Sequence, residues 1–383
     1  MNKKGLAALA AATALSLLGV AAAQAGGFSR GTADTDILFE QGNFNARTSI
    51  TVVSPERKIV SGPSNVGHDY ADTYVMPSLA AKFRISDNLS CAGTIANAFG
   101  AASSYDTPRL TDLSGQGKLE ETFTVMEYGA TCAVGFDLEK GRLSVLGGVF
   151  VEDFDYDLTL GQILPPPGAP VVHALGAELS GTAWGWRAGV AYEIPEIALR
   201  GQLLYRSGTK IDADGNANHL QLGSIAAGGT GKLPQSVEAK FQTGIAPGWL
   251  AYGSVKWTDW SVNKDLTLVL KPGFIPDIER PNHYNWRDGW TVMAGIGHSF
   301  TDNISGTAFV MWDRGVSTGW DLYGDVVTVG TGLIMKDQFG GELRLGGGIS
   351  HVGSVKETEY GAANYAVGNG WSFSGLAGYS MKW

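Results

Sequence analysis

The chain lacks long hydrophobic runs. After its N-terminal stretch, the 383-residue sequence has no continuous apolar run near the ~18 residues that a membrane-spanning helix requires. Charged residues are scarce at 17%, whereas apolar residues reach 44% and glycine occurs 54 times. A chain carries this much hydrophobicity without long runs when apolar and polar residues alternate. We therefore exclude a helical membrane protein and look for strands.

Motifs for catalysis and metal binding are also missing. The six histidines show no metal-ligand spacing, and no glycine-rich phosphate loop joins a strand to a helix. No spacing pairs a serine with a histidine and a carboxylate, although triads assemble in space. We expect no enzyme, no cofactor and no bound metal. The net charge of −9 argues against a nucleic-acid partner.

The N-terminus predicts export. Lys3 and Lys4 precede an apolar run over 5–20, and Ala-Gln-Ala at 23–25 is a small-x-small cleavage site. A membrane anchor is the alternative, but the run is short and leads directly into the cleavage motif. We expect residues 1–25 to be a cleaved secretory signal peptide.

Cysteine occurs only twice, at Cys91 and Cys132. Our strand assignment puts them on neighbouring strands with their side chains on the same side. Export permits a disulfide. Two small, lipid-facing apolar side chains explain the pattern equally well.

Alternation predicts strands that face lipid on one side. In WSFSGLAGYSMKW, residues 371–383, aromatic residues share one parity, and the other parity is mostly small or polar. The same pattern recurs in 184–193, 197–205 and 290–300, and charges stay on one parity. A charge facing lipid near the bilayer centre costs about 2–4 kcal/mol, which explains this confinement. Aromatic residues at strand ends favour a membrane β-barrel over a soluble β-sandwich.

Short and long connections alternate along the chain. Tight turns are predicted at 86–88, 138–141, 194–196, 246–248 and 301–303. Longer connections are predicted at 56–71, 101–119, 158–182, 212–231, 263–286 and 314–323. This order fits the periplasmic turns and outer loops of one closed barrel with about 14 strands.

The predicted fold is all-β. We expect an antiparallel transmembrane β-barrel over 44–383, with long extracellular loops. Residues 26–43 are too polar for a strand and too long for a bare tail, and we expect them to form a hatch inside the lumen. The barrel is expected in the bacterial outer membrane as a monomer, in contact with lipid and lipopolysaccharide.

Several segments resemble the FadL/TodX-type outer-membrane transporters for long-chain fatty acids and hydrophobic hydrocarbons. The resemblance covers nearly the whole mature chain, and Trp-Thr-Asp-Trp-Ser and Tyr-Arg-Ser before Lys-Ile-Asp are its more specific parts. It is carried by Gly-Gly-Phe at 26–28, WGWRAGVAYEI at 184–194, LLYRSGTKID at 203–212, LPQSVEAKF at 233–241, WLAYGSVKWTDWS at 249–261, RDGWTVMAGIGHSF at 287–300 and the C-terminal stretch.

The resemblance implies a plugged barrel that captures apolar ligands at its outer loops and releases them sideways at a kinked third strand. Phe28 would be the hatch residue near the pocket. Asn97, Ala98, Phe99 and Gly100 would lie at the kink. The hatch lacks the family's Asn-Pro-Ala motif, which leaves its shape and its seal open.

Two connections suggest a capture groove. The first, over 158–185, is unusually apolar and carries a run of three prolines, which stiffens it. An exposed apolar patch marks a site for an apolar ligand. A lid formed by the two loops packing on each other is the alternative. The expected groove residues are Leu164, Pro166, Val171, Val172 and Leu175, with Leu220, Leu222 and Ile225 as the opposite wall.

Charged residues are expected inside the lumen. Arg187, Arg200, Lys240 and Lys256 fall on the predicted inner face of four successive strands, where they would steer a head group or pair with Glu193, Glu238 and Asp259. We favour the pairing. Asp153, Asp155 and Asp157 share one face at the end of the fifth strand. We assign them to the lumen or its mouth, with a divalent-cation site as the less favoured alternative. Family members that hold a carboxylate use basic groups there, so this run favours a neutral ligand.

Three functions are therefore open. The leading one is passive uptake of hydrophobic small molecules, captured in the loop groove and released through the barrel wall. The second is a general diffusion porin for small polar solutes, against which the apolar loop argues. The third, an outer-membrane lipid hydrolase, requires a serine and histidine pair at the lipid face.

Overall fold

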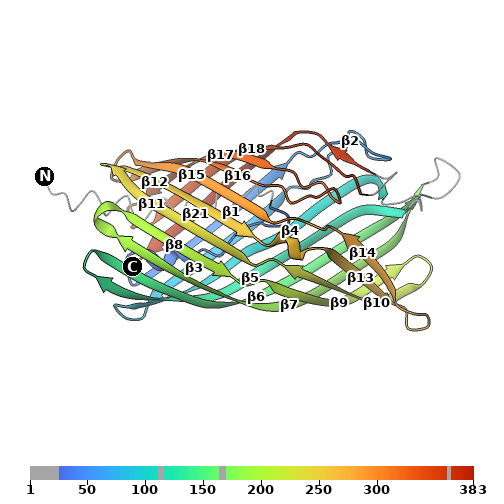
Figure 1. Cartoon of the computed structure of the whole chain (residues 1–383), viewed down its shortest axis with the longest axis horizontal. Coiled ribbons are helices and arrows are strands. Elements are labelled where there is room, and N and C mark those ends of the chain that lie inside the picture. The colour runs from blue at the N-terminus through green and yellow to red at the C-terminus, as the bar shows by residue number, and fades with distance from the viewer. Residues whose placement is uncertain (1–25, 111–115, 164–169, 360–363) are drawn as a thin grey trace.

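The protein is a closed β-barrel, seen here in a computed structural model that describes residues 26–110, 116–163, 170–359 and 364–383. Over these residues, 18 strands form one antiparallel sheet, and the last strand pairs with the first to close it (Figure 1). Eight of the 18 strands form four pairs, and the two strands of each pair continue one another across a short break. The wall therefore has 14 strand positions, here called staves. The predicted fold class and strand number are confirmed. The signal peptide lies outside the described residues.

Ten staves are single strands. They are β1 (Phe44–Pro55), β3 (Tyr74–Arg84), β4 (Leu89–Leu110), β5 (Gln116–Leu138), β6 (Gly141–Ile163), β7 (Val171–Ile194), β16 (Ile304–Asp313), β17 (Val326–Lys336), β18 (Glu342–Val352) and β21 (Gly370–Lys382). The interrupted staves are β8 (Leu199–Arg206) with β9 (Thr209–His219), β10 (Gly223–Leu233) with β11 (Ser236–Ala246), β12 (Trp249–Thr258) with β13 (Asp265–Lys271), and β14 (Ile278–His283) with β15 (Gly289–Ser299).

Helical structure in the described ranges is limited to the short 3-10 turns η2 (Thr35–Phe39), η3 (Pro195–Ile197) and η4 (Trp260–Val262). None of these helices is long and apolar enough to cross a membrane. A second, small sheet joins β2 (Ile59–Ser61), β20 (Ala366–Val367) and β19 (Val355–Lys356).

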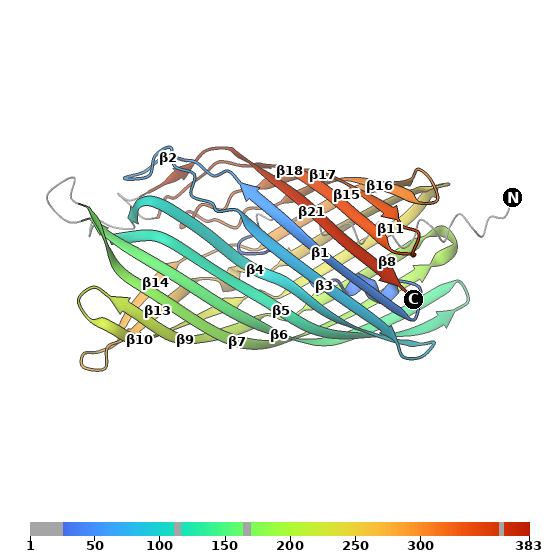
Figure 2. The same ribbon diagram turned by 180° about the vertical axis from the view of Figure 1, so that it is seen from behind.

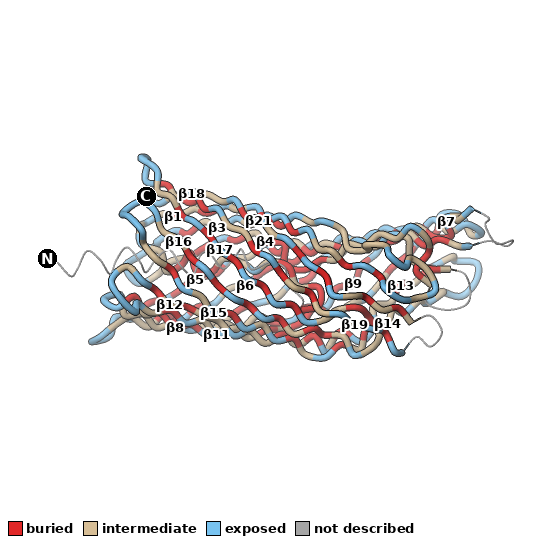
Figure 3. The backbone as a smooth tube through the Cα atoms, turned by 90° about the horizontal axis from the view of Figure 1, so that it is seen from above, coloured by how far each residue is buried: buried red, intermediate tan, exposed pale blue. Residues whose placement is uncertain are grey.

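Side-chain parity follows the prediction. Exposed and buried residues alternate along the strands (Figure 3). In β21, Trp371 and Phe373 are about half exposed, whereas Ser372 and Leu376 are buried. Trp184 and Trp186 of β7 also point outward, and Arg187 is buried on the other parity. Large apolar side chains on an exposed surface fit a wall that is solvated by lipid.

The tight turns lie where they were predicted, but the strands extend farther at the opposite end of the barrel. The strands β4 to β7 contain 22, 23, 23 and 24 residues, about twice the ~9–11 residues that cross a bilayer. Most of 158–182 and 212–231, predicted as loops, is therefore strand. Their apolar residues pack inside the extended wall, which is why these segments are less polar than loops.

The two ends of the wall meet at the tight-turn end. The carbonyl of Trp383 accepts hydrogen bonds from the amides of Asn43 and Phe44, at 2.9 and 3.2 Å. Figure 2 shows β1 between β21 and β3 at this seam. The barrel wall therefore begins and ends at the same end of the barrel.

Cys91 and Cys132 are joined by a disulfide. They are directly opposite each other on β4 and β5. Cys91 also lies opposite Phe83 of β3, which is 56% exposed. Of the two alternatives left open by the sequence, the structure has the cross-strand bridge, on the lipid-facing side.

Candidate functional site

Residues 26–43, here called the N-terminal segment, lie inside the barrel. Its turn η2 buries Ile37 and Leu38. These two side chains pack against inward-facing residues of five neighbouring staves, namely Ala80, Ala92, Ala133, Leu146 and Ala191. The segment thus fills part of the lumen toward the tight-turn end.

Phe28 lies in a cage of aromatic rings. Its ring centroid is 4.6 Å from those of Phe123 and Trp286, and 5.4 Å from that of Tyr284. Trp260 and Tyr323 complete the cage at 5.9 and 5.7 Å. The rings come from β5, from η4, from the break between β14 and β15, and from the connection after β16. Ring pairs at these separations are attractive beyond their buried area, so the cage holds the N-terminal segment in place.

Gly27 allows the close approach of the segment to this cage. Its φ of +57° is a conformation that side chains disfavour. A Cβ at this position would lie 2.5 Å from Cζ3 of Trp286 and 2.9 Å from Cε2 of Trp260. Glycine is therefore required both by the backbone conformation and by the space.

The N-terminal segment also pairs with β4, at the predicted kink. The amides of Arg30 and Gly31 donate to the carbonyls of Ala98 and Asn97, at 2.9 and 2.7 Å. The amide of Gly100 donates to the carbonyl of Phe28 at 2.9 Å. Here β4 is irregular, because its register with β5 shifts between Asn97 and Phe99.

The neighbouring stave leaves β4 at this point. The strand β3 pairs with β4 only from Ser78 to Arg84, opposite residues 90–96. Beyond Ala96, the N-terminal segment occupies the edge that β3 has left. The expected Asn97, Phe99 and Gly100 therefore lie where the wall between β3 and β4 is interrupted and covered from inside.

Ion pairs hold the acidic end of the N-terminal segment. Lys240 of β11 lies 3.0 Å from the carboxylate of Asp36, and both side chains are at least nine-tenths buried. The other pairs are Asp34 with Arg47, and Glu40 with Arg47 and Arg344. The barrel wall thus supplies cations to a segment that carries several anions.

The predicted lumen cations lie inside the barrel, and most form pairs. Arg200 lies 3.8 Å from Glu193, and Lys240 lies 3.7 Å from Glu238. Arg187 pairs with Glu127. Lys256 lines a small cavity of about 50 Å³ next to the N-terminal segment. Asp259 instead accepts a hydrogen bond from Gln235 at 2.9 Å.

The sequence analysis did not identify the residues at the centre of the ion pairs inside the barrel. Arg206 pairs with Glu127 at 2.9 Å and also with Glu152. Thr209 donates a hydrogen bond to Glu152. Glu127 and Glu152 are 2% and 0% exposed. The available signal was that Glu127, Glu152 and Arg206 each fall on the inward parity of their strand.

The assignment of Asp153, Asp155 and Asp157 to the lumen is wrong. All three are exposed, and the inward parity of β6 is taken by Glu152, Phe154 and other residues. Asp153 lies opposite Thr182, two residues beyond the exposed Trp184. The acidic run therefore lies on the outer surface beyond the aromatic belt, where water solvates it. In the described ranges, no three His, Cys, Asp or Glu residues could hold a metal ion. The argument for a neutral ligand from these charges therefore fails.

A cavity of about 500 Å³, here called the apolar cavity, lies inside the extended part of the barrel. Phe28 forms part of its lining. Most of its wall is apolar, with Phe123, Phe154, Leu158, Leu160, Leu179, Ile211, Leu233, Leu266 and Leu268. Its charged lining residues are Lys118, Glu121, Lys232 and Arg280, and the first two pair with each other at 2.5 Å. This arrangement suits a largely apolar ligand.

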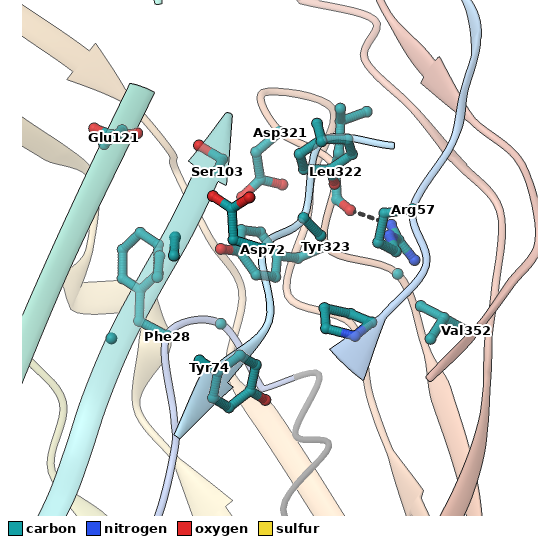
Figure 4. Close-up of a pocket in the computed structure, with 18 of the residues that line it drawn as sticks. Phe28, Arg57, Asp72, Tyr74, Ser103, Glu121, Asp321, Leu322, Tyr323 and Val352 are labelled. Atoms are coloured by element: carbon teal, nitrogen blue, oxygen red, sulfur yellow. Dashed lines mark hydrogen bonds between the residues drawn. The ribbon is translucent and has the colours of Figure 1, made fainter. Parts of the chain in front are cut away.

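A second cavity of about 190 Å³ is also lined by Phe28, and more charged side chains line it than line the apolar cavity. Figure 4 shows Arg57, Asp72, Tyr74 and Asp321 around it, with the guanidinium of Arg57 donating to the carbonyl of Leu322. Burial raises the pKa of Asp321 to about 6, although hydrogen bonds from Ser317 and Trp286 act in the opposite direction. Phe28 therefore borders two compartments of different polarity.

The structure places the expected groove residues in different environments. Leu164 and Pro166 lie outside the described residues. Leu175 and Ile225 are buried in the apolar cluster that surrounds Phe28, and Leu222 packs against it. Val171 and Val172 are half-buried in β7, and Leu220 is 57% exposed. None of the described members lines the apolar cavity. Val171, Val172, Leu175 and Ile225 lie in strands, and Leu220 and Leu222 lie in the turn between β9 and β10.

The family profile and the curated relatives that match this chain belong to the same family of outer-membrane transport proteins. The profile described as "Outer membrane protein transport protein (OMPP1/FadL/TodX)" matches residues 33–315. The long-chain fatty acid transport protein of Salmonella typhi is 26% identical, over 74% of this chain and 71% of that protein. The protein of the same name from Escherichia coli O6:H1 is 26% identical, over 95% of this chain and 90% of its own.

Solved structures share the fold. A FadL homologue of Pseudomonas aeruginosa superimposes with a TM-score of 0.70 at 14% identity, over 95% of this chain and 97% of the other. The toluene transporter TodX of Pseudomonas putida gives a TM-score of 0.60 at 14% identity, over 96% and 97%. At this identity, the likeness concerns the arrangement of the barrel.

Proposed function

The chain belongs to the outer membrane transport protein family (OMPP1/FadL/TodX), and on that premise we propose that it takes up hydrophobic small molecules by passive diffusion. Curated relatives are long-chain fatty acid transport proteins, and solved neighbours include toluene transporters. Long-chain fatty acids and hydrocarbons are therefore the proposed substrates. The resemblance inferred from the sequence is confirmed.

The observation that carries this proposal is the apolar cavity, which is bordered by the N-terminal segment. Its wall is formed mainly by leucine, isoleucine and phenylalanine. An apolar solute that leaves water for such a site gains about 25 cal/mol for each Å² of apolar surface buried. The cavity would therefore concentrate solutes that the lipopolysaccharide layer excludes.

The proposed route passes Phe28 and leaves beside β4. The N-terminal segment covers the interruption between β3 and β4, so its displacement from Asn97, Phe99 and Gly100 would open a path toward the membrane. In this scheme the segment is the hatch, and the barrel works as a monomer in contact with lipid and lipopolysaccharide. Export would depend on residues 1–25. Transport is downhill and requires no catalytic step.

Uptake and conductance test the proposal. A strain that lacks its own fatty acid and hydrocarbon uptake proteins, complemented with this chain, should accumulate labelled oleate or toluene. The purified protein should give little steady conductance in a planar bilayer. Steady conductance together with no gain in uptake would favour the diffusion porin. Esterase activity of the purified protein would point to the hydrolase.

A further inference from the structure

One polar side chain in the wall of the apolar cavity differs from its neighbours. Asn263 is 1% exposed and contributes to the lining. Neither its Oδ1 nor its Nδ2 has a hydrogen-bond partner among the residues that the structure describes. Buried amides are nearly always hydrogen-bonded, and an unpaired one is unfavourable.

We propose that Asn263 makes the apolar cavity selective for molecules that carry a neutral hydrogen-bonding group, a hydroxyl or a carbonyl, on an apolar body. This inference rests on the proposed function and specifies its substrate class. The primary amide both donates and accepts, so it complements groups of this kind.

The backbone fixes the position of Asn263. Its amide donates to the carbonyl of Trp260 at 3.0 Å, and its carbonyl accepts from the amide of Trp286 at 3.4 Å. Both tryptophans belong to the cage around Phe28. Asn263 therefore cannot leave the cavity wall without disturbing the aromatic cage that holds the N-terminal segment. A ligand that reaches its side-chain amide lies close to Phe28.

Several other polar groups of the wall are already paired. Lys118 pairs with Glu121, which also accepts a hydrogen bond from the hydroxyl of Tyr156 at 3.0 Å. Asn282 donates to the hydroxyl of Tyr284 at 2.8 Å. These groups would have to give up a partner in order to bind a ligand, whereas Asn263 would gain one.

Arg280 is the competing anchor. It donates to Gln116 at 3.3 Å, and its Nε has no partner among the described residues. A guanidinium would select a carboxylate. Asn263 carries no charge to compensate a buried carboxylate, whose burial is strongly unfavourable. Recognition by Asn263 therefore predicts a neutral polar ligand, whereas recognition by Arg280 predicts a carboxylate.

Three ten-carbon probes separate these cases: n-decane, 1-decanol and decanoate, each titrated into detergent-solubilised full-length protein. Asn263→Leu should weaken the affinity for 1-decanol roughly tenfold, as expected for one lost hydrogen bond to a buried partner. It should leave the affinity for n-decane within about twofold of the wild type. Asn218→Leu is the matched control, because Asn218 is exposed on β9 and does not line the apolar cavity. It should leave the affinity for 1-decanol unchanged.

Stability provides a second readout. Asn263→Leu removes no hydrogen bond from the empty protein, so its unfolding midpoint should equal or exceed that of the wild type. A large drop would mean that the amide has a structural partner, and the inference would be wrong. It would also be overturned if Asn263→Leu left the affinity for 1-decanol unchanged or weakened all three probes equally. Failure of the wild type to bind any probe would instead count against the proposed function.

Discussion

Lys240 and Asp36 join the barrel wall to the N-terminal segment through an ion pair whose nitrogen and oxygen atoms are 3.0 Å apart. The side chains are only 9% and 7% exposed. In water such a pair contributes little, but at this burial the loss of one partner leaves an uncompensated charge. The binding of the N-terminal segment to the barrel wall therefore depends on the charges of Lys240 and Asp36.

Replacing Lys240 by methionine should loosen the N-terminal segment. Removal of one partner of a buried pair typically weakens a structure by about 3–5 kcal/mol, and here the remaining cations near Asp36 reduce the effect. Single-channel recording should show more frequent open events. Lys210→Met is the control, because Lys210 pairs with Asp212 at 60% and 62% exposure. Equal conductance in both variants would contradict the prediction.

Gly27→Ala should displace the segment by steric conflict. The new methyl group would lie 2.5 Å from Trp286, and φ is +57°. Gly67→Ala separates the two effects, since Gly67 has φ of +91° with no atom within 4 Å of a built Cβ. Limited proteolysis should cut residues 26–43 faster in Gly27→Ala than in Gly67→Ala. Similar cleavage rates would contradict displacement of the segment by the new methyl group.

Asp321 should make stability depend on pH. Burial raises its pKa from 3.8 to about 6, so the folded state holds this proton more tightly than the unfolded state. Its contribution is therefore full below about pH 3.8 and is lost as pH rises through about 6, a change of up to about 3 kcal/mol.

Urea unfolding of Asp321→Asn between about pH 4 and pH 8 checks this contribution. The variant should lose the part of the pH dependence that Asp321 supplies and should be more stable than the wild type at the alkaline end. The exposed Asp277 provides the control, Asp277→Asn, which should keep the wild-type profile. An unchanged profile in Asp321→Asn would be inconsistent with a raised pKa.

The cysteines should be unreactive without reductant. Cys91 and Cys132 are bridged across 41 residues of sequence, and such bridges typically stabilise a fold by about 2–4 kcal/mol. Maleimide should label the denatured protein only after reduction. The Cys91→Ser, Cys132→Ser double variant should unfold at lower denaturant concentration. Labelling without reductant would refute the bridge.

Membrane physics explains how much of the barrel could be predicted. Lipid excludes charge from one face of each strand, so parity identified the outward Trp184 and the inward Arg187 from sequence alone. The tight turns followed from their turn-forming residues. The partners of the lumen cations were less accessible, because Glu127 and Arg206 are 79 residues apart and meet only through the curvature of the barrel.

The same physics explains the errors. Beyond the aromatic belt, water reaches the outer face of the wall, so charge no longer identifies the lumen side. Asp153 was therefore assigned to the wrong face, and the apolar Leu175 was interpreted as loop instead of inner wall. Asn263 carries no sequence signal, since its importance comes from the hydrogen bonds that its surroundings do not supply.

The seam between β1 and β21 sets an order of events during biogenesis. The cylinder cannot shut until the last dozen residues are synthesised, since residues 45–55 pair with residues 372–382. Phe28 and its ring partners are drawn from the start, middle and later parts of the chain. Closure of the barrel therefore follows the synthesis of β21, and the aromatic cage around Phe28 is completed only after Tyr323 has been synthesised.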